Sequence, residues 1–226
     1  MNHDGHDANA ATAGAEATRR ALIMAGLELF GRRGFEATST REIASAASAN
    51  IGSIAYHFGG KDGLRAACAR HIVETIRAVA GPAVGLGEAE VADADAAEQR
   101  LVQAVQRMVA FMVAHPEPAV FVQFLLREIS EAGATMNVLY EGVVEPVHKR
   151  LCQLWGQATG QPPESERTRI AVFAMVGQII YFRIGRAPVL RRMGWQDIGP
   201  TEAGRLAAIF TENLKAALRA HREAGQ

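Results

Sequence analysis

Apolar residues near the start of the chain recur at the spacing of a helix. They occupy positions i, i+3, i+4, i+7 and i+8, and they are Leu22, Ala25, Gly26, Leu29 and Phe30. This spacing puts them on one face, so it predicts an amphipathic helix with that face toward a core. Gly34 follows the last apolar position and predicts the end of this helix.

A second helix is predicted to begin near Thr40. Ser39 and Glu42 form an S-x-x-E capping box, in which a hydroxyl and a carboxylate satisfy free backbone N–H groups at a helix start. The apolar residues Ile43, Ala44 and Ala47 would face inward from this helix.

A tight turn through Ser48 and Ala49 leads to a third helix. Asn50 is its expected N-cap, and Ile54 with Phe58 forms its inner side. Two short helices joined by a turn are typical of a helix-turn-helix, whose second helix enters the DNA major groove. The outer face of that helix is small and hydrogen-bonding, and it consists of Ile51, Gly52, Ser53, Tyr56 and His57.

The run from Thr18 to Leu64 resembles the N-terminal DNA-binding domain of the TetR/AcrR family of bacterial transcriptional regulators. The resemblance rests on the combined spacing of LELF, GFEATSTREIA, YHF and GKDGL. Two positions depart from the family pattern: Ser48 replaces a turn glycine, and Ala55 replaces a tyrosine. Tyr56 is the next residue and points about 100° further around the helix, so the family's phosphate contact transfers less directly to it.

The resemblance and the helix starts together suggest roles for the DNA-binding residues. Thr40 and Lys61 would hold phosphates, which positions the protein without reading sequence. Arg41 could bond guanine O6 and N7 together, for about 1–3 kcal/mol of discrimination, or form an ordinary surface salt bridge. Gly52 would allow close approach to the groove, and His57 could contact a phosphate or end its helix. The full predicted set is Thr40, Arg41, Asn50, Ile51, Gly52, Ser53, Tyr56, His57 and Lys61.

Breaks in the helical pattern divide the chain into three parts. Pro82, Gly85 and Gly87 predict the end of a fourth helix, which starts at Lys61. We therefore expect a disordered tail over residues 1–17, a helix-turn-helix domain over residues 18–81 and a larger helical domain over residues 82–226.

Long helical patterns fill the third part. They cover residues 94–114, 118–131, 135–158, 164–185 and 201–221. Pro146 should kink the third of them, since proline cannot donate a backbone hydrogen bond. With the four earlier helices, the sequence predicts an all-α protein of about nine helices: a three-helix DNA-binding domain followed by a helical ligand-binding and dimerisation domain.

The stretches LLREISEAG, EGVVEPVHKRL and FAMVGQIIYFRIGRAPVL resemble the C-terminal domain of CecR-type regulators within the same family. The family implies a homodimer in which the last two long helices pack against their copies. Two apolar stripes favour this independently, because they exceed what one subunit obviously needs. One stripe is Ile170, Phe173, Ala174, Gly177 and Tyr181, and the other is Leu206, Ile209, Phe210, Leu214 and Leu218.

Aromatic and methionine residues interleaved with polar ones favour a ligand cavity in the helical domain, although ordinary core is the alternative for each. The predicted ligand-binding residues are Phe111, Phe124, Arg127, Glu128, Met136, Tyr140, Gln178, Tyr181 and Phe182. Arg127, Glu128 and Gln178 need partners if they are buried among apolar helices. They could orient a ligand, pair with one another or lie in water.

Charge and composition narrow the class of protein. The net charge is zero, but residues 18–81 hold nine Lys or Arg against five Asp or Glu, a modest positive balance that favours two copies per DNA site and salt-sensitive binding. The apolar runs are too short to span a bilayer and residues 1–17 lack the features of a signal peptide, so we expect a cytoplasmic protein. Cys68 and Cys152 are expected to be reduced, buried thiols.

No motif of hydrolase, metalloprotease or thiol redox chemistry occurs, so we expect neither an enzyme nor a bound metal or cofactor. The sequence predicts a homodimeric transcriptional regulator that binds a palindromic double-stranded DNA operator. Repression that a small-molecule effector relieves is the favoured mode, with activation as its alternative. A helical enzyme, and a dimeric scaffold that has lost DNA binding through Ser48 and Ala55, are the other classes left open.

Overall fold

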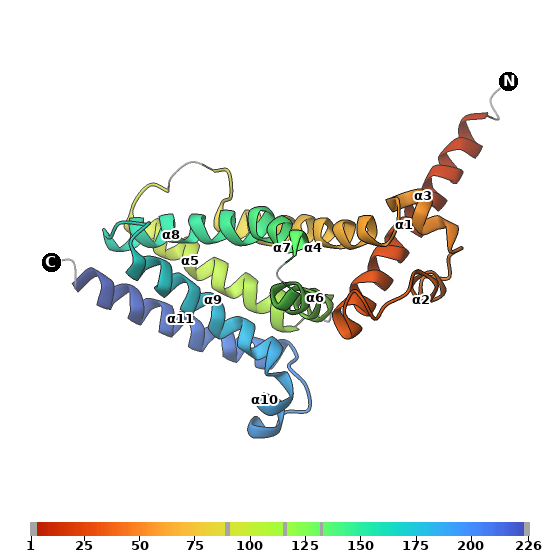
Figure 1. Cartoon of the computed structure of the whole chain (residues 1–226). Helices are drawn as coiled ribbons and strands as arrows, with labels where there is room; N and C mark the ends of the chain where they lie inside the picture. Colours follow the sequence, from red (N-terminus) through yellow and green to blue (C-terminus); the bar gives the residue numbers. More distant parts are fainter. Residues whose placement is uncertain (1–3, 89–90, 115–116, 132, 224–226) are drawn as a thin grey trace. The chain divides into compact units, whose positions relative to one another are not determined.

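The computed structural model describes residues 4–88, 91–114, 117–131 and 133–223, and every regular element in these ranges is helical (Figure 1). The all-α prediction is therefore confirmed. The elements are α1 (Asp4–Arg33), α2 (Thr40–Ala46), α3 (Gly52–Phe58), α4 (Lys61–Val84), α5 (Ala94–Val109), η1 (Ala110–Ala114), α6 (Glu117–Glu131), α7 (Ala134–Leu139), η2 (Tyr140–Val144), α8 (Glu145–Thr159), α9 (Glu166–Ile184), α10 (Arg186–Met193) and α11 (Pro200–Glu223), where η marks a π-helical segment.

The chain forms two compact units. Unit 1 comprises Met1–Val73 and Gln123–Leu139, and unit 2 comprises Glu74–Val122 and Tyr140–Gln226. This division differs from a boundary at residue 81, because α4 continues through Pro82 to Val84 and contributes to both units. The segment 123–139 also groups with the helix-turn-helix and not with the rest of the C-terminal part.

Unit 1 encloses a small core that α1, α2, α3 and α4 supply. Its side chains Leu22, Phe30, Ile43, Ile54 and Leu64 are each at most 2% exposed. The apolar stripe predicted on the first helix faces this core, and the helix ends at Arg33, next to Gly34 with a left-handed φ of +84°. The predicted starts of α2 and α4, at residues 40 and 61, are confirmed.

The N-terminal tail is the first difference from prediction. Residues 1–17 were expected to be disordered, whereas α1 already begins at Asp4 and residues 1–3 lie outside the described ranges. This segment is rich in alanine, the strongest helix former. The hydroxyl of Thr18 donates to the Gly14 carbonyl oxygen at 3.0 Å, and Arg19 pairs with Glu16 at 3.4 Å. Residues 12–17 are exposed, so packing against a core does not hold this part of α1. Helix propensity and the local side-chain bonds stabilise it instead.

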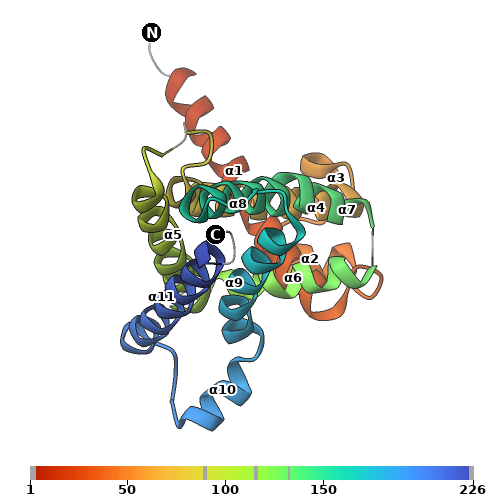
Figure 2. The ribbon, with the colours of Figure 1, turned by 90° about the vertical axis from the view of Figure 1, so that its left-hand side faces the viewer.

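Unit 2 is built around α5, α8, α9 and α11, which pack against one another (Figure 2). Their shared core includes Leu101, Leu154, Trp155, Ile179 and Leu218, each at most 1% exposed. The indole N–H of Trp155 donates to Nδ1 of His221 at 3.1 Å, so the one polar atom of this large ring is satisfied.

Two features of the helical pattern after residue 133 differ from the prediction. The predicted helix over residues 135–158 is divided into α7, η2 and α8, with Pro146 in the first turn of α8. Proline has no N–H to donate into the preceding turn, and the π-helical segment η2 accommodates the change. The sequence prediction also missed α10, which lies between Gly185 and Gly194.

Both cysteines are free and buried, as predicted. Burial raises the pKa of the Cys152 thiol to about 11 and also raises that of Cys68, so neither thiol is activated. Within the described ranges, no single helix is long and apolar enough to cross a membrane, and only two sharply bent helix pairs reach the required length and composition together.

The turn between α2 and α3 contains a left-handed serine. Ser48 has a φ of +53°, and no other non-glycine residue among those that the structure describes has a positive φ. Its N–H donates to the Ser45 carbonyl oxygen at 3.1 Å, and the Ala49 N–H donates to the Ala44 carbonyl oxygen at 2.9 Å. These bonds close the C-terminus of α2 and require a left-handed backbone at Ser48. Residues other than glycine adopt this backbone conformation at a cost of about 1–2 kcal/mol.

Ser48→Gly is therefore expected to raise the free energy of unfolding by about 0.5–1 kcal/mol, because the relief of strain exceeds the extra chain entropy of glycine. Urea denaturation monitored by circular dichroism measures this change. Ser45→Gly is the matched control, since the same substitution inside α2 should destabilise by about 0.5 kcal/mol, the difference between the helix propensities of serine and glycine. Equal destabilisation by both variants would contradict the role of the left-handed turn.

Candidate nucleic-acid interface

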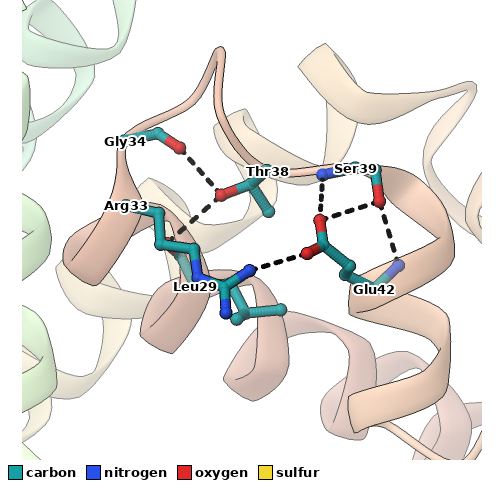
Figure 3. Close-up of polar contacts among 6 residues, drawn as sticks. All are labelled: Leu29, Arg33, Gly34, Thr38, Ser39 and Glu42. Atoms are coloured by element: carbon teal, nitrogen blue, oxygen red, sulfur yellow. Dashed lines mark hydrogen bonds and ion pairs between the residues drawn. The ribbon is translucent and has the colours of Figure 1, made fainter.

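The start of α2 is fixed by the predicted capping box (Figure 3). The Glu42 N–H donates to the Ser39 hydroxyl oxygen at 3.2 Å, and the Ser39 N–H donates to Oε2 of Glu42 at 2.9 Å. The Ser39 hydroxyl in turn donates to the same carboxylate oxygen at 2.8 Å. Two otherwise free N–H groups are thereby satisfied, and the position of Thr40 and Arg41 is set by local bonds.

The same carboxylate ties α2 to the end of α1. Arg33 donates to Oε1 of Glu42 at 2.6 Å, and the hydroxyl of Thr38 donates to the Gly34 carbonyl oxygen at 2.8 Å (Figure 3). The hydrogen bonds from the backbone and hydroxyl of Ser39, together with the Arg33 guanidinium, lower the pKa of Glu42 below its ordinary value of 4.5.

The start of α3 differs by one residue from the prediction. Ile51, and not Asn50, occupies the N-cap position, and its side chain makes no capping bond. Asn50 nevertheless serves the helix start, because its Oδ1 accepts the Gly52 N–H at 2.9 Å and its carbonyl oxygen accepts the Ser53 N–H at 2.9 Å. The side chain of Asn50 therefore belongs to the turn geometry.

All nine predicted DNA-binding residues belong to unit 1, and each has solvent-accessible surface. Arg41, Asn50 and Gly52 are exposed, while Thr40, Ser53, His57 and Lys61 are partly exposed. Tyr56 is 82% exposed and Ile51 is 49% exposed. The ring of Tyr56 meets His57 edge to face, with centroids 4.9 Å apart. The structure thus presents these side chains on α2, the turn, α3 and the first turn of α4.

Phe35, in the loop after α1, organises the basic residues at the start of α4. The ammonium of Lys61 lies 4.2 Å from the centre of its ring, and the guanidinium of Arg65 lies 4.5 Å from it. Both are cation–π contacts. Sequence reasoning overlooked Phe35 and Arg65, since no local pattern links positions 26 and 30 residues apart.

Glu128, one of the predicted ligand-binding residues, lies in a buried ion pair. It is 2% exposed and accepts two hydrogen bonds from Arg65, at 2.8 and 2.9 Å. Arg65 also pairs with Glu131. Burial by itself would lower the pKa of Arg65, but the hydrogen bonds that it donates to Glu128 and Glu131, and the negative charge of these carboxylates, outweigh burial and raise the pKa. A bidentate pair satisfies both charges and ties α4 to α6 within unit 1.

Arg127 and Gln178, the other charged or amide residues of the predicted ligand-binding set, also have hydrogen-bond partners. Arg127 is exposed and donates to the Arg32 carbonyl oxygen at 3.4 Å. Gln178 is partly exposed, and its Oε1 accepts a bond from Asn213 at 3.1 Å.

The nine predicted ligand-binding residues are divided between the units. Unit 1 holds Phe124, Arg127, Glu128 and Met136, and unit 2 holds Phe111, Tyr140, Gln178, Tyr181 and Phe182. Phe124 is fully buried, whereas Tyr140 and Tyr181 are 46% and 56% exposed. A surface cavity of about 460 Å³ in unit 2 is lined by other residues, namely Glu166, Arg167, Ile170, Ala171 and His221.

Comparison with known proteins gives consistent matches over most of the chain. The family model of bacterial regulatory proteins of the tetR family matches residues 22–68. The model of the C-terminal domain of the HTH-type transcriptional dual regulator CecR matches residues 97–221, more than half of the chain.

Individual relatives agree with these models. The chain is 33% identical over 184 residues to the HTH-type transcriptional dual regulator CecR of Shigella flexneri, which covers 80% of this chain and 82% of that protein. It is 25% identical over 206 residues to the HTH-type transcriptional regulatory protein RaaS of Mycobacterium tuberculosis, with 89% of each covered. The crystal structure of AibR in complex with isovaleryl coenzyme A and operator DNA shares the fold, with a TM-score of 0.64 and 17% identity. The match covers 86% of this chain and 96% of the AibR chain.

The lowered pKa of Glu42 makes the capping box sensitive to acid. A carboxylate whose folded pKa is depressed adds stability above its unfolded pKa, and this contribution is lost as the pH falls through the folded pKa. We expect NMR titration of the Glu42 carboxyl carbon to show a midpoint below 4.5. The midpoint should rise in Ser39→Ala, which removes the hydroxyl bond and keeps the backbone N–H bond, and it should also rise in Arg33→Gln, which removes the guanidinium charge.

Arg32→Gln is the matched control for this titration, since Arg32 is exposed and pairs with Glu28. It should leave the Glu42 midpoint unchanged. A wild-type midpoint at the ordinary value, or an equal effect of the Arg32 and Arg33 variants, would contradict the assigned network.

Proposed function

The chain belongs to the TetR family of bacterial regulatory proteins, with a C-terminal domain of the CecR type, and on this basis we propose that it is a homodimeric repressor released from a palindromic operator by a small molecule. Its membership identifies a transcriptional regulator with a DNA-binding domain, not an enzyme. The observation that carries the proposal is the exposed outer surface of α2 and α3, which presents Arg41 on α2, Ile51 at the turn and Tyr56 on α3.

Contacts with DNA would divide into two kinds. The Thr40 hydroxyl and the Lys61 ammonium would hold phosphates and position the domain. Arg41 is exposed and has no ion-pair partner among the described salt bridges, so its planar guanidinium is available for guanine. Asn50, Gly52, Ser53 and His57 would line the groove around these contacts. The modest positive charge of residues 18–81 favours two domains per operator.

An uncovered apolar face on α9 supports a homodimer. One side of α9 packs in the core of unit 2 through Val172, Met175 and Ile179, yet the opposite side is also apolar. Its exposed residues are Ile170, Phe173, Ala174, Gly177, Tyr181 and Ile184. An exposed apolar face of this kind is typical of a surface that a partner covers.

The second predicted stripe, on α11, mostly faces its own subunit. Leu206, Phe210, Leu214 and Leu218 are buried in the core of unit 2, and Ile209 is 52% exposed. This corrects the expectation that the whole stripe exceeds the needs of one subunit. We propose that α9 supplies most of the dimer surface and that α11 adds Ile209. A two-fold axis through this surface would match a palindromic operator.

Ligand response would follow from a molecule that prefers the conformation with low DNA affinity. A tenfold preference shifts the equilibrium by about 1.4 kcal/mol, and coupling of about 1–3 kcal/mol suffices for partial release. AibR is similar in fold and was solved with isovaleryl coenzyme A and operator DNA, which supports a small-molecule effector here. Helix α4 contributes to both units, so a shift of α4 would couple ligand to DNA. Action on chromosomal DNA would place the protein in the cytoplasm.

Selection of duplexes from random DNA by the purified protein tests the regulatory function. We expect enrichment of an inverted repeat whose binding weakens with salt. Arg41→Ala should reduce discrimination at one base pair per half-site by roughly 5- to 150-fold. Lys61→Ala should weaken all sequences alike and lower the salt slope by about two, one for each subunit of the dimer. Arg70→Ala, an exposed arginine of α4 outside the predicted set, serves as the control. Absence of any enriched sequence would favour the scaffold alternative.

The oligomeric state tests the α9 surface. Ile170 is 60% exposed, and Ile170→Glu would bury a charge in the proposed interface. We expect light scattering to show a dimer for the wild type and a monomer for this variant at micromolar concentration. Ile129→Glu is the matched control, because Ile129 is 53% exposed on α6. A dimer that survives Ile170→Glu but dissociates in Ile129→Glu would place the interface elsewhere.

A further inference from the structure

The outer face of α3 lacks the side chains that read bases by hydrogen-bond pairs. Residues 50–58 contain no Lys, Arg, Asp, Glu or Gln. Arginine, lysine, asparagine, glutamine and the acids make the specific polar contacts with base edges in the major groove. Asn50 is the remaining candidate of this kind on the turn and helix.

Asn50 is held by the turn. Its Oδ1 accepts the Gly52 N–H at 2.9 Å, and its carbonyl oxygen accepts the Ser53 N–H. Bidentate recognition of adenine requires the amide oxygen and nitrogen together, in the plane of the base. Because the turn sets the orientation of this amide, Asn50 is poorly placed to choose an adenine.

Apolar surface dominates what α3 does present. Ile51 is 49% exposed, Tyr56 is 82% exposed and Ala55 is exposed beside them. Ile51 and Ala55 are four residues apart and so lie one above the other, with Tyr56 on the adjoining side. We call Ile51, Ala55 and Tyr56 the apolar reading surface. The apolar feature of the major groove is the C5-methyl group of thymine.

We propose that the apolar reading surface reads thymine methyl groups, so that the base pairs facing α3 in each half-site are A·T pairs with their methyls toward Ile51 and Tyr56. Arg41, on α2, then supplies the polar contact at the flank of the same half-site. This inference rests on the proposed function, because it specifies the sequence class of the operator that the helix-turn-helix binds.

Deoxyuridine tests the contact directly, since it differs from thymine by the methyl group alone. The probe is the duplex that the protein itself selects from random DNA. We expect replacement of a contacted thymine by deoxyuridine to weaken binding about 4-fold, the effect of one buried methyl group. Replacing the T·A pair by 5-methylcytosine·guanine, which keeps the methyl, should bind tighter than cytosine·guanine at the same position.

Variants of the protein assign the methyl to a residue. In Ile51→Ala or Tyr56→Ala, the uridine effect should disappear at the thymine that each residue contacts, while other positions remain sensitive. Lys61→Ala is the comparison, because it should weaken binding overall and retain the full uridine effect. Circular dichroism of each variant confirms that the exposed substitutions leave the fold intact.

The outcomes separate this inference from the proposed function. Sequence-specific binding that is unchanged by deoxyuridine would overturn thymine reading and leave the regulator intact. A uridine effect that persists in both the Ile51 and Tyr56 variants would overturn the assignment to the apolar reading surface. A random pool without enrichment would overturn the proposed function, and the inference with it.

Discussion

The proposed DNA-facing surface depends on how the first N–H groups of α2 are satisfied. Helices α2 and α3 have seven residues each, too few to be stable alone in water. The capping box of Ser39 and Glu42, with Arg33 on the same carboxylate, fixes where α2 starts. Ile43 and Ile54 then anchor the two helices in the core of unit 1. A displaced cap would rotate Arg41 and shift the turn that leads to α3, so recognition depends on local hydrogen bonds.

Buried charge in unit 1 serves the fold. Glu128 lies among apolar residues and looked suited to orient a ligand, yet Arg65 satisfies both of its oxygens. A buried carboxylate requires such a partner, and removing one member of a buried pair costs about 3–5 kcal/mol. The cation–π contacts of Phe35 with Lys61 and Arg65 extend this network to the start of α4. The positive charge near the proposed phosphate contacts is therefore held in place by Phe35 and Glu128, which lie outside the predicted DNA-binding set.

The two faces of α9 connect the core of unit 2 with the proposed assembly. Its inner face completes a core shared with α5, α8 and α11, while its outer face leaves Ile170 and Phe173 more than half exposed. A second copy of the chain would cover the outer face and supply the second recognition helix that a palindrome requires. The same dimer would thus raise the affinity of a modestly charged domain for DNA and bury the apolar outer face of α9.

The sequence by itself determined the all-α class, the capping box, the end of α1 at Gly34 and the start of α4, because each depends on bonds or apolar spacing within a few residues. It also placed the candidate DNA-binding residues on α2, α3 and the start of α4. Only the tertiary structure decided that Glu128 pairs with a residue 63 positions away and that the α11 stripe faces inward. Spacing encodes which residues share a helix face, but what covers that face depends on packing between segments distant in sequence.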